Sequence, residues 1–306
     1  MLSVKFSIGN AENNSFAIEA TFAHHYSYSY HCAAVLLLIK SRWEGKLAVV
    51  TGASAGIGLA IARAFVRSGL NVVGLARRKE KMESEMANAD GKGSFYAYEC
   101  DIANEQSISN AFQWIEEKFK TIHVIVNNAG VGKPGKIMEL DFEILKNAID
   151  VNLTGLLLCS KLAIVLMKEA HEAHIVNINR QCLGKAKDIA DENIRTFYKT
   201  FVSSLFGHQV YISPKLPYAN IYPATKFAVR ALSEVLRREQ NDGNIRITNI
   251  SPGAVRTEMI QHSLENLERL EILEPEDIAN AIIYAIGTPS RVQIEELTIT
   301  PAKILS

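Results

Sequence analysis

Short apolar runs alternate along the chain with longer stretches whose apolar residues recur at helical spacing. A short apolar run that ends at a turn is typical of a strand buried in a parallel sheet. Strands are predicted at residues 47–50, 71–75, 94–99, 123–126, 174–179, 245–250 and 293–300. Residues 105–119 carry Ile108, Phe112, Ile115 and Phe119 on one helical face, which predicts a helix that faces the core.

Three further helical segments follow from the same pattern. Residues 142–167 read as two helices in near succession, broken around 150–155, and the second is apolar almost all round. Such a helix must be covered on both sides. Residues 275–286 predict a helix with acidic residues in its first turn. Residues 261–273 alternate Leu with Glu and Arg, which indicates an amphipathic helix that covers either an apolar substrate or the protein itself.

The segment 47–63 combines a strand, a glycine turn and a helix. Gly52, Gly56 and Gly58 allow the backbone to turn without Cβ clashes and bring amide groups close to a diphosphate at the start of the helix. A turn that binds nothing is the alternative. The strand before the turn and the helix after it favour dinucleotide binding.

The end of the second predicted strand bears on the choice of cofactor. An acidic residue at this place would bind the ribose 2′-hydroxyl group of NAD. The chain has Arg77, Arg78 and Lys79 there instead, which suits the additional phosphate of NADP. The alternative is a solvated helix start, but cations are poorly placed at a helix N-terminus on dipole grounds.

Tyr222 and Lys226 form the second chemically informative pair. On a helix, residues i and i+4 share a face, and Pro223 is acceptable in the first turn. An ammonium group beside a phenol lowers the pKa of the phenol and allows it to exchange a proton near neutrality.

Four motifs in this order resemble the short-chain dehydrogenase/reductase superfamily, and most of all its insect farnesol-dehydrogenase-like branch. They are TGxxxGxG at 51–58, NNAG at 127–130, DVN at 150–152 and YxxxK at 222–226. The resemblance implies an α/β fold with a single Rossmann-type, doubly wound parallel sheet and helices on both faces, over residues 43–306. It also implies an NADP-dependent dehydrogenase that interconverts an alcohol and its carbonyl compound, and assembly as a homodimer or homotetramer. The alcohol would be allylic or isoprenoid, such as farnesol, or a steroid-like secondary alcohol.

The resemblance also assigns roles to residues. Tyr222 would exchange the proton, Lys226 would lower the pKa of Tyr222 and hold the ribose, Ser204 would bind the carbonyl oxygen, and Asn152 would position a relay water. Asp101 would lie beside the adenine ring, and the loop 251–257 would close over the nicotinamide. The implied cofactor-binding set is Gly52, Ser54, Gly56, Ile57, Gly58, Arg77, Arg78, Asp101, Ile102, Asn128, Ala129, Gly130, Tyr222, Lys226, Pro252, Gly253, Val255 and Thr257.

The chain departs from the family pattern after the strand predicted at 174–179. A serine should follow at once, but Arg180 follows, and a Ser-x-x-Gly sequence appears only at Ser204. We interpret residues 180–203 as an insertion, of the kind that a retained intron or a misjudged exon boundary would produce. The rival hypothesis is therefore a catalytically impaired NADP-binding pseudoenzyme or splice variant, in which the serine is removed from the site.

Residues 1–42 form an extension before the expected start of the domain. We expect a poorly ordered tail or an over-long gene model, with a segment that touches a membrane weakly as the alternative. The only apolar run of this extension, residues 32–39, is far shorter than the roughly 20 residues that span a bilayer.

The overall composition excludes several classes of function. Lys and Arg equal Asp and Glu at 33 each, so no net basic charge attracts nucleic acid. The 4 cysteines show no CxxC pair, so we expect neither disulfides nor a zinc site, and a reducing, cytoplasmic location. His171 and His174 are expected to be a surface pair and not metal ligands.

Overall fold

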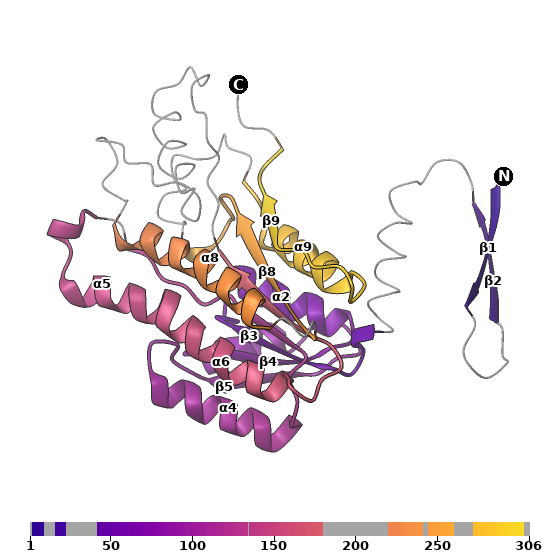
Figure 1. Cartoon of the computed structure of the whole chain (residues 1–306), viewed down its shortest axis with the longest axis horizontal. Coiled ribbons are helices and arrows are strands. Elements are labelled where there is room, and N and C mark those ends of the chain that lie inside the picture. The colour runs from indigo at the N-terminus through magenta and orange to yellow at the C-terminus, as the bar shows by residue number, and fades with distance from the viewer. Residues whose placement is uncertain are drawn as a thin grey trace.

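Seven parallel strands form one sheet, with strand order β5-β4-β3-β6-β7-β8-β9 (Figure 1). The computed structural model describes residues 2–8, 16–22, 42–133, 135–179, 220–240, 244–259 and 272–302. The strands of the sheet are β3 (Leu47–Thr51), β4 (Asn71–Ala76), β5 (Phe95–Glu99), β6 (Val124–Asn127), β7 (Ala173–Ile178), β8 (Ile245–Pro252) and β9 (Glu296–Ile299). Because β3 pairs with β4 on one side and with β6 on the other, the strand order reverses at β3 and opens a crevice at the carboxyl ends of these strands.

Helices cover both faces of this sheet, which confirms the doubly wound α/β fold. The helical elements are α2 (Gly56–Arg67), α3 (Lys79–Met86), α4 (Glu105–Phe119), η1 (Ile137–Glu139), α5 (Phe142–Ile149), η2 (Asp150–Gly155), α6 (Leu156–Met167), α8 (Ile221–Glu239) and α9 (Pro275–Gly287). Helices α2 and α9 pack over one face, and α4, α6 and α8 pack over the other. Strand β3 contributes Ala48 and Val50 to the first core and Leu47 and Val49 to the second, which explains its unbroken apolar run.

The expected break between two helices at 150–155 is instead a π-helical turn, η2, that joins α5 to α6. A π-turn inserts one residue into a helix, so the helical face is shifted between α5 and α6 while the helical path continues from Phe142 to Met167. Phe142–Met167 is the one helix in the described part of the chain that is long and apolar enough to cross a membrane. Core helices of soluble proteins also pass this test, so the feature is weak evidence for a membrane span.

His174 is not at the surface, so the expected surface pair of histidines is wrong. The side chain lies on β7 in the middle of the sheet, is fully buried, and its Nε2 lies 2.8 Å from Thr248 Oγ1. Burial, followed by the positive charges of Arg246 and Arg42, holds the pKa of His174 well below its ordinary value. His171 alone is exposed.

The beginning of the domain is fixed by a clamp of charged groups at the amino ends of the strands. Glu172 accepts hydrogen bonds from Arg42 Nε at 2.6 Å and from Arg246 Nη2 at 3.0 Å. The indole of Trp43 is fully buried and donates to Ile286 O at 3.0 Å, at the end of α9. Arg42 and Trp43 are therefore attached to the sheet and to α9.

The N-terminal extension, the predicted insertion and the helix predicted at 261–273 lie outside the described strands of this sheet. Strands β1 (Leu2–Ile8) and β2 (Phe16–Phe22) form a separate antiparallel pair, which the sequence analysis did not anticipate within the extension. The predicted insertion at 180–203, Ser204 and most of the helix predicted at 261–273 lie outside the described residues. Leu273 is described, and it pairs with Val255 in a parallel bridge where the sequence predicts the end of that helix.

Candidate active site

A cavity of about 530 Å³ lies at the carboxyl ends of the strands, where their order reverses. Its lining comes from the segments that follow β3 to β8 and from the first turns of α8. Of the predicted site residues, the lining includes Gly52, Ser54, Gly56, Ile57, Arg77, Arg78, Asp101, Ile102, Asn128, Ala129, Gly130, Tyr222, Lys226, Pro252, Gly253, Val255 and Thr257. The structure thus brings together residues that lie more than 200 positions apart in the chain.

The glycine loop between β3 and α2 depends on the absence of side chains. Gly52 and Gly56 have φ values of +69° and +53°, which favour glycine. Gly58 does not line the cavity, but a Cβ atom on it would lie 2.3 Å from Gly52 O. Helix α2 therefore approaches the loop closely because position 58 is glycine. Its N-cap, Ala55, makes no side-chain capping bond to the described residues, and Ala55, Gly56 and Ile57 line the cavity, so the first turn of α2 borders the cavity without a side-chain cap.

Asn128 fixes the glycine loop from the neighbouring strand. Its Nδ2 donates to Thr51 O at 2.9 Å, and its backbone N–H and that of Ala129 both donate to Thr51 Oγ1 at 3.0 Å. These bonds join the end of β6 to the end of β3. The NNAG motif thus supports the loop that the sequence predicts for diphosphate binding.

Charged groups surround the end of β4. Arg78 donates to Ser54 Oγ from Nε at 3.2 Å and to Glu258 Oε2 from Nη1 at 3.0 Å. Lys81 Nζ donates to Glu258 Oε1 at 2.5 Å. Hydrogen bonds from Lys81 and then Arg78 hold the pKa of Glu258 below its ordinary value, so its carboxylate is charged at neutrality. The sequence analysis identified Arg77 and Arg78 but neither Lys81 nor Glu258.

Asn152 lies in the π-turn and is fully buried. Its Oδ1 accepts from Val131 N at 2.8 Å, and its Nδ2 donates to Val131 O at 2.9 Å and to Thr225 Oγ1 at 3.2 Å. Thr225 in turn donates to Tyr222 O at 2.7 Å. Asn152 does not line the cavity itself; it connects the loop after β6 to the helix that carries Tyr222.

Tyr222 and Lys226 lie in the first two turns of α8 and face the cavity together. Lys226 is buried, its Nζ donates to Ile178 O at 2.9 Å, and the same atom lies 5.6 Å from the centroid of the Tyr222 ring. Asn220 caps the helix by accepting from Tyr222 N at 3.1 Å. The predicted i, i+4 pair is therefore on one face, with the ammonium group near the phenol.

Asn179 is a cavity residue that the sequence analysis did not identify as a site residue. It follows β7, is 3% exposed, and neither its Oδ1 nor its Nδ2 has a hydrogen-bond partner among the residues that the structure describes. Buried polar atoms are nearly always paired, so an unpaired amide at a cavity points to a ligand group. The only signal in the sequence was its position directly before Arg180, where the family pattern is broken.

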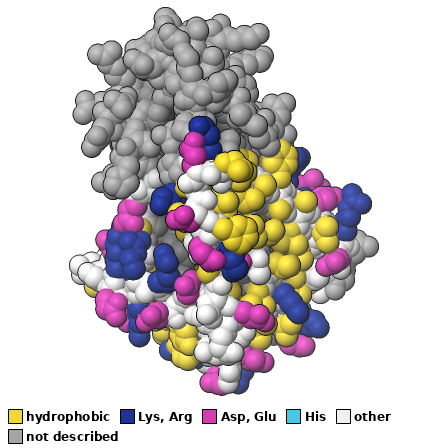
Figure 2. Space-filling view, turned by 90° about the vertical axis from the view of Figure 1, so that its left-hand side faces the viewer, with side chains coloured by type: hydrophobic (Ala, Val, Ile, Leu, Met, Phe, Trp, Pro, Cys, Tyr) yellow, Lys and Arg dark blue, Asp and Glu magenta, His cyan; other side chains and the backbone are white. Residues whose placement is uncertain are grey.

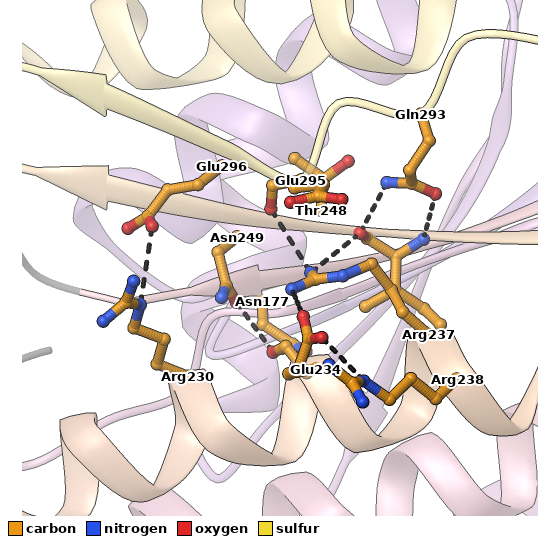
Figure 3. Close-up of polar contacts among 12 residues, drawn as sticks. Asn177, Arg230, Glu234, Arg237, Arg238, Thr248, Asn249, Gln293, Glu295 and Glu296 are labelled. Carbon is orange, nitrogen blue, oxygen red and sulfur yellow. Dashed lines mark hydrogen bonds and ion pairs between the residues drawn. The ribbon is translucent and has the colours of Figure 1, made fainter.

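Arginines on α8 fix this helix to the last two strands (Figure 3). Arg237 donates to Ile247 O and to Glu295 O, each at 3.4 Å, and Arg230 lies 3.7 Å from Glu296. Beneath them, Ser233 Oγ donates to Asn249 Oδ1 at 2.7 Å and accepts from Asn177 Nδ2 at 2.8 Å. Helix α8 is thus held to the sheet by polar contacts on the same side that presents Tyr222 and Lys226.

The described residues do not favour catalysis by a cysteine nucleophile or by a bound metal ion. Burial raises the pKa of the Cys100 thiol, which lines the cavity, to about 11, so the thiol is protonated and unsuited to nucleophilic attack. The described part of the chain contains no group of three or more His, Cys, Asp or Glu side chains that would hold a metal ion.

A comparison with protein families agrees with the motifs. A family model described as short chain dehydrogenase matches residues 46–183 and 200–268. The unmatched stretch between these two parts, 184–199, falls within the segment interpreted as an insertion at 180–203. Residues before 46 are also outside the match.

Similar proteins and solved structures cover most of the chain. Farnesol dehydrogenase from Aedes aegypti is 41% identical over 266 residues, which is 85% of this chain and 97% of that protein. Dehydrogenase/reductase SDR family member 11 from Homo sapiens is 34% identical over 277 residues, 86% of this chain and 96% of that protein. An alcohol dehydrogenase from Thermococcus sibiricus, complexed with 5-hydroxy-NADP, superposes with a TM-score of 0.65 at 26% identity, covering 83% of this chain and 96% of that one.

Proposed function

The chain belongs to the short-chain dehydrogenase family, and from this premise we propose that it is an NADP-dependent alcohol dehydrogenase/carbonyl reductase. The family makes it an oxidoreductase of alcohols and carbonyl compounds. The proposal of NADP dependence and of proton exchange at Tyr222 rests on one observation. The glycine loop, Arg77 and Arg78, and Tyr222 and Lys226 all line the same cavity.

The cavity residues fit a nicotinamide dinucleotide phosphate. Positions 52, 56 and 58 have no side chains where the backbone must approach a diphosphate. The amide of Asn179 follows β7, on the other side of β3 from the arginines after β4. It is buried without a partner among the described side chains, and it offers a donor and an acceptor. Arg77 and Arg78 supply positive charge for a 2′-phosphate. Two similar solved structures are complexed with such a dinucleotide: 5-hydroxy-NADP in the Thermococcus sibiricus alcohol dehydrogenase and NADP+ in a serine dehydrogenase.

The cofactor supplies the hydride chemistry, and the side chains of the chain move the proton. We assign the proton exchange with the substrate oxygen to Tyr222, because its phenol faces the cavity beside the Lys226 ammonium group. The ammonium group stabilises the phenolate relative to the phenol. Asn152 positions Val131 and Thr225, and its Oδ1 keeps a second lone pair for the relay water that the family resemblance implies. Ser204 would bind the carbonyl oxygen.

The proposed substrate is a small apolar alcohol or its carbonyl compound. The cavity lining includes the apolar side chains of Val131, Ile178 and Met259. A relative with 41% identity is a farnesol dehydrogenase, which supports an allylic or isoprenoid alcohol, and a steroid-like secondary alcohol has a similar apolar body. A panel of both alcohol types with NADP, and of their carbonyl compounds with NADPH, tests this assignment.

Cofactor preference is tested by titrating NADPH and NADH against the wild-type protein and the Arg77→Ala variant. Each charge-assisted bond to a phosphate contributes roughly 1.5–3 kcal/mol, so the variant should bind NADPH about tenfold or more weakly while NADH binding stays the same. Arg67→Ala is the matched control, because Arg67 is exposed at the far end of α2. Equal affinity of the wild type for NADPH and NADH would refute the proposal.

A second candidate function is a catalytically impaired NADP-binding protein. It is favoured by Arg180, which stands where the family pattern has a serine, and by the stretch that the family model leaves unmatched. A chain that lacks residues 180–203, which joins Asn179 to Ser204, distinguishes the two. Equal NADPH binding with much faster carbonyl reduction in the shortened chain supports the impaired form. Equal turnover in both chains, lost in Ser204→Ala, supports the enzyme.

We also propose a homodimer or homotetramer in the cytoplasm. The outer side of α5 and α6 exposes Phe142, Leu157 and Val165. Figure 2 shows a band of hydrophobic side chains on the side of the molecule that it presents. Exposed apolar surface of this extent is typical of subunit interfaces. Sedimentation of the wild type and of Leu157→Glu tests this: the variant should sediment as a smaller species, and a monomeric wild type contradicts it.

A further inference from the structure

A carboxylate of the chain itself occupies the basic end of the cavity. Glu258 follows β8, 180 residues after Arg78, yet its two oxygens accept from Arg78 at 3.0 Å and from Lys81 at 2.5 Å. Arg78 also donates to Ser54 Oγ from Nη2 at 3.1 Å. Ser54, Arg78 and Glu258 all line the cavity. These groups form one charged cluster, defined here as Ser54, Arg78, Lys81 and Glu258.

The geometry of this cluster is that of a bound anion between two cations. A carboxylate and a phosphate present oxygens of similar size and charge to Arg and Lys, and both accept the forked bonds of a guanidinium group. Here both Arg78 Nη1 and Arg78 Nη2 donate to one oxygen of Glu258, at 3.0 and 3.1 Å. A 2′-phosphate that binds to Arg78 must take the place of this carboxylate, because the same donors cannot serve both.

We propose that Glu258 is a specificity-determining residue, an internal anion that occupies the 2′-phosphate subsite and must be displaced by NADP(H) but not by NAD(H). The proposal rests on the NADP dependence proposed above. It also assigns Lys81 as a further cation of this subsite, since Lys81 shares the carboxylate with Arg78. Glu258 therefore lowers the preference for NADP(H) below what the cations alone would give.

The competing explanation is that the ion pair between Arg78 and Glu258 only stabilises the fold. The solvent exposure of both side chains argues against this. The side chains of Arg78 and Glu258 are 51% and 49% exposed. Exposed ion pairs contribute little to stability. Their effect on a charged ligand is direct, because that ligand competes for the same donors.

The experiment measures binding by calorimetry, without catalysis, for adenosine 2′,5′-bisphosphate and for 5′-AMP, which lacks the 2′-phosphate. The proteins are the full-length wild type, Glu258→Gln and Glu83→Gln. Glu83 is the matched control, because it pairs with Lys79 on α3 and touches neither Arg78 nor Lys81. Thermal unfolding of each protein confirms that it is folded.

The expected result is that Glu258→Gln binds adenosine 2′,5′-bisphosphate about two- to fivefold more tightly, the scale of exposed ion pairs, with 5′-AMP unchanged and no effect of Glu83→Gln. Adding Lys81→Met to Glu258→Gln should reverse much of this gain. Unchanged or weaker bisphosphate binding by Glu258→Gln would overturn the inference. If the wild type and both variants bind the two nucleotides equally, the proposed NADP dependence itself is wrong. The experiment thus distinguishes failure of the Glu258 inference from failure of the proposed function.

Discussion

At the scale of single residues, the side chains of the site are positioned through the backbone of neighbouring segments. Lys226 donates to Ile178 O, Asn152 binds both the N–H and the C=O of Val131, and Asn128 donates to Thr51 O. A backbone carbonyl has no alternative rotamers, so these contacts restrict the side chains more than contacts to flexible side chains would. The proposed chemistry then depends on the phenol of Tyr222, which supplies the proton that is exchanged with the substrate.

Tyr222→Phe should retain NADPH binding and lose nearly all turnover. The ring remains against Gly132, where a Cβ atom would lie 3.0 Å from Tyr222 Cδ2, but the transferable proton is removed. A positioned acid or base contributes roughly 10²–10⁴-fold in rate, which sets the expected loss. Stopped-flow carbonyl reduction and NADPH fluorescence measure the two effects. Tyr284→Phe, an exposed change on α9, is the control and should turn over normally.

His174 should make the folded state less stable in mild acid. Its pKa in the folded chain lies well below the ordinary value of 6.5, so the unfolded chain takes up a proton that the folded chain excludes. The free energy of unfolding is therefore fully retained above about pH 6.5 and falls as the pH drops below it. His123 acts in the same direction, because burial and then the charge of Lys46 lower its pKa to about 4.

The measurement is the difference in Tm between pH 7 and pH 5 for the wild type, His174→Gln and the exposed His171→Gln. His174→Gln should lose less Tm than the wild type on acidification, with the remaining loss due in part to His123. His171→Gln should behave as the wild type. A His174→Gln protein with an undiminished loss would show that another group governs the acid sensitivity.

At the scale of elements, the close approach of α2 to the glycine loop is the most demanding contact. Gly58→Ala should destabilise the protein severely and abolish cofactor binding, because the new Cβ atom would lie 2.3 Å from Gly52 O and 2.5 Å from Asn128 Nδ2. Overpacking of this kind costs about 1–3 kcal/mol or more. Gly130→Ala is the control, since its Cβ atom would have ordinary contacts, the nearest at 3.5 Å. Urea unfolding compares them, and equal stability losses would contradict this account.

The sequence was sufficient to predict those parts of the site that are formed by a few residues close together in the chain. The glycine loop and the pair Tyr222 and Lys226 are of this kind, because a turn and an i, i+4 spacing are local geometry. The sheet was also predictable, since strands buried on both faces leave a continuous apolar run. The ends of strands were less predictable: β9 is four residues long, whereas a strand was predicted over 293–300.

The residues that the sequence did not reveal act through partners far away along the chain. Glu258 meets Arg78 across 180 positions, and neither position carries a motif for the pairing. The unpaired amide of Asn179 is defined by what surrounds it in the fold. His174 was predicted at the surface with His171 because no Cys or third His accompanies the pair. Its burial depends on the register that places it beside Arg246 on β8.

At the scale of the whole molecule, the clamp of Arg42, Glu172 and Arg246 joins the start of the domain to the amino ends of β7 and β8. Glu172→Gln should lower the free energy of unfolding by about 3 kcal/mol, the lower end of the range for a broken buried ion pair, because Glu172 is partly exposed. The change leaves two arginines without their shared carboxylate. Urea unfolding measures the loss.

Glu169→Gln removes the same charge from an exposed position three residues away and should have little effect. If both variants lost stability equally, net charge and not the clamp would be responsible. Full cofactor affinity in Glu172→Gln is also expected, since the clamp lies at the amino ends of the strands and the cavity lies at their carboxyl ends.

The position of β3 in the middle of the sheet has a consequence for the chain during its synthesis. Strands β3, β4 and β5 pair with one another in chain order, but the second edge of β3 is covered only by β6, and Val126 pairs with Val50 from 76 residues later. At translation rates of about 5–20 residues per second, that edge waits about 4–15 s for its partner after β3 has emerged. An apolar strand with an unpaired edge binds other chains readily, so this interval is when the nascent protein most needs a chaperone.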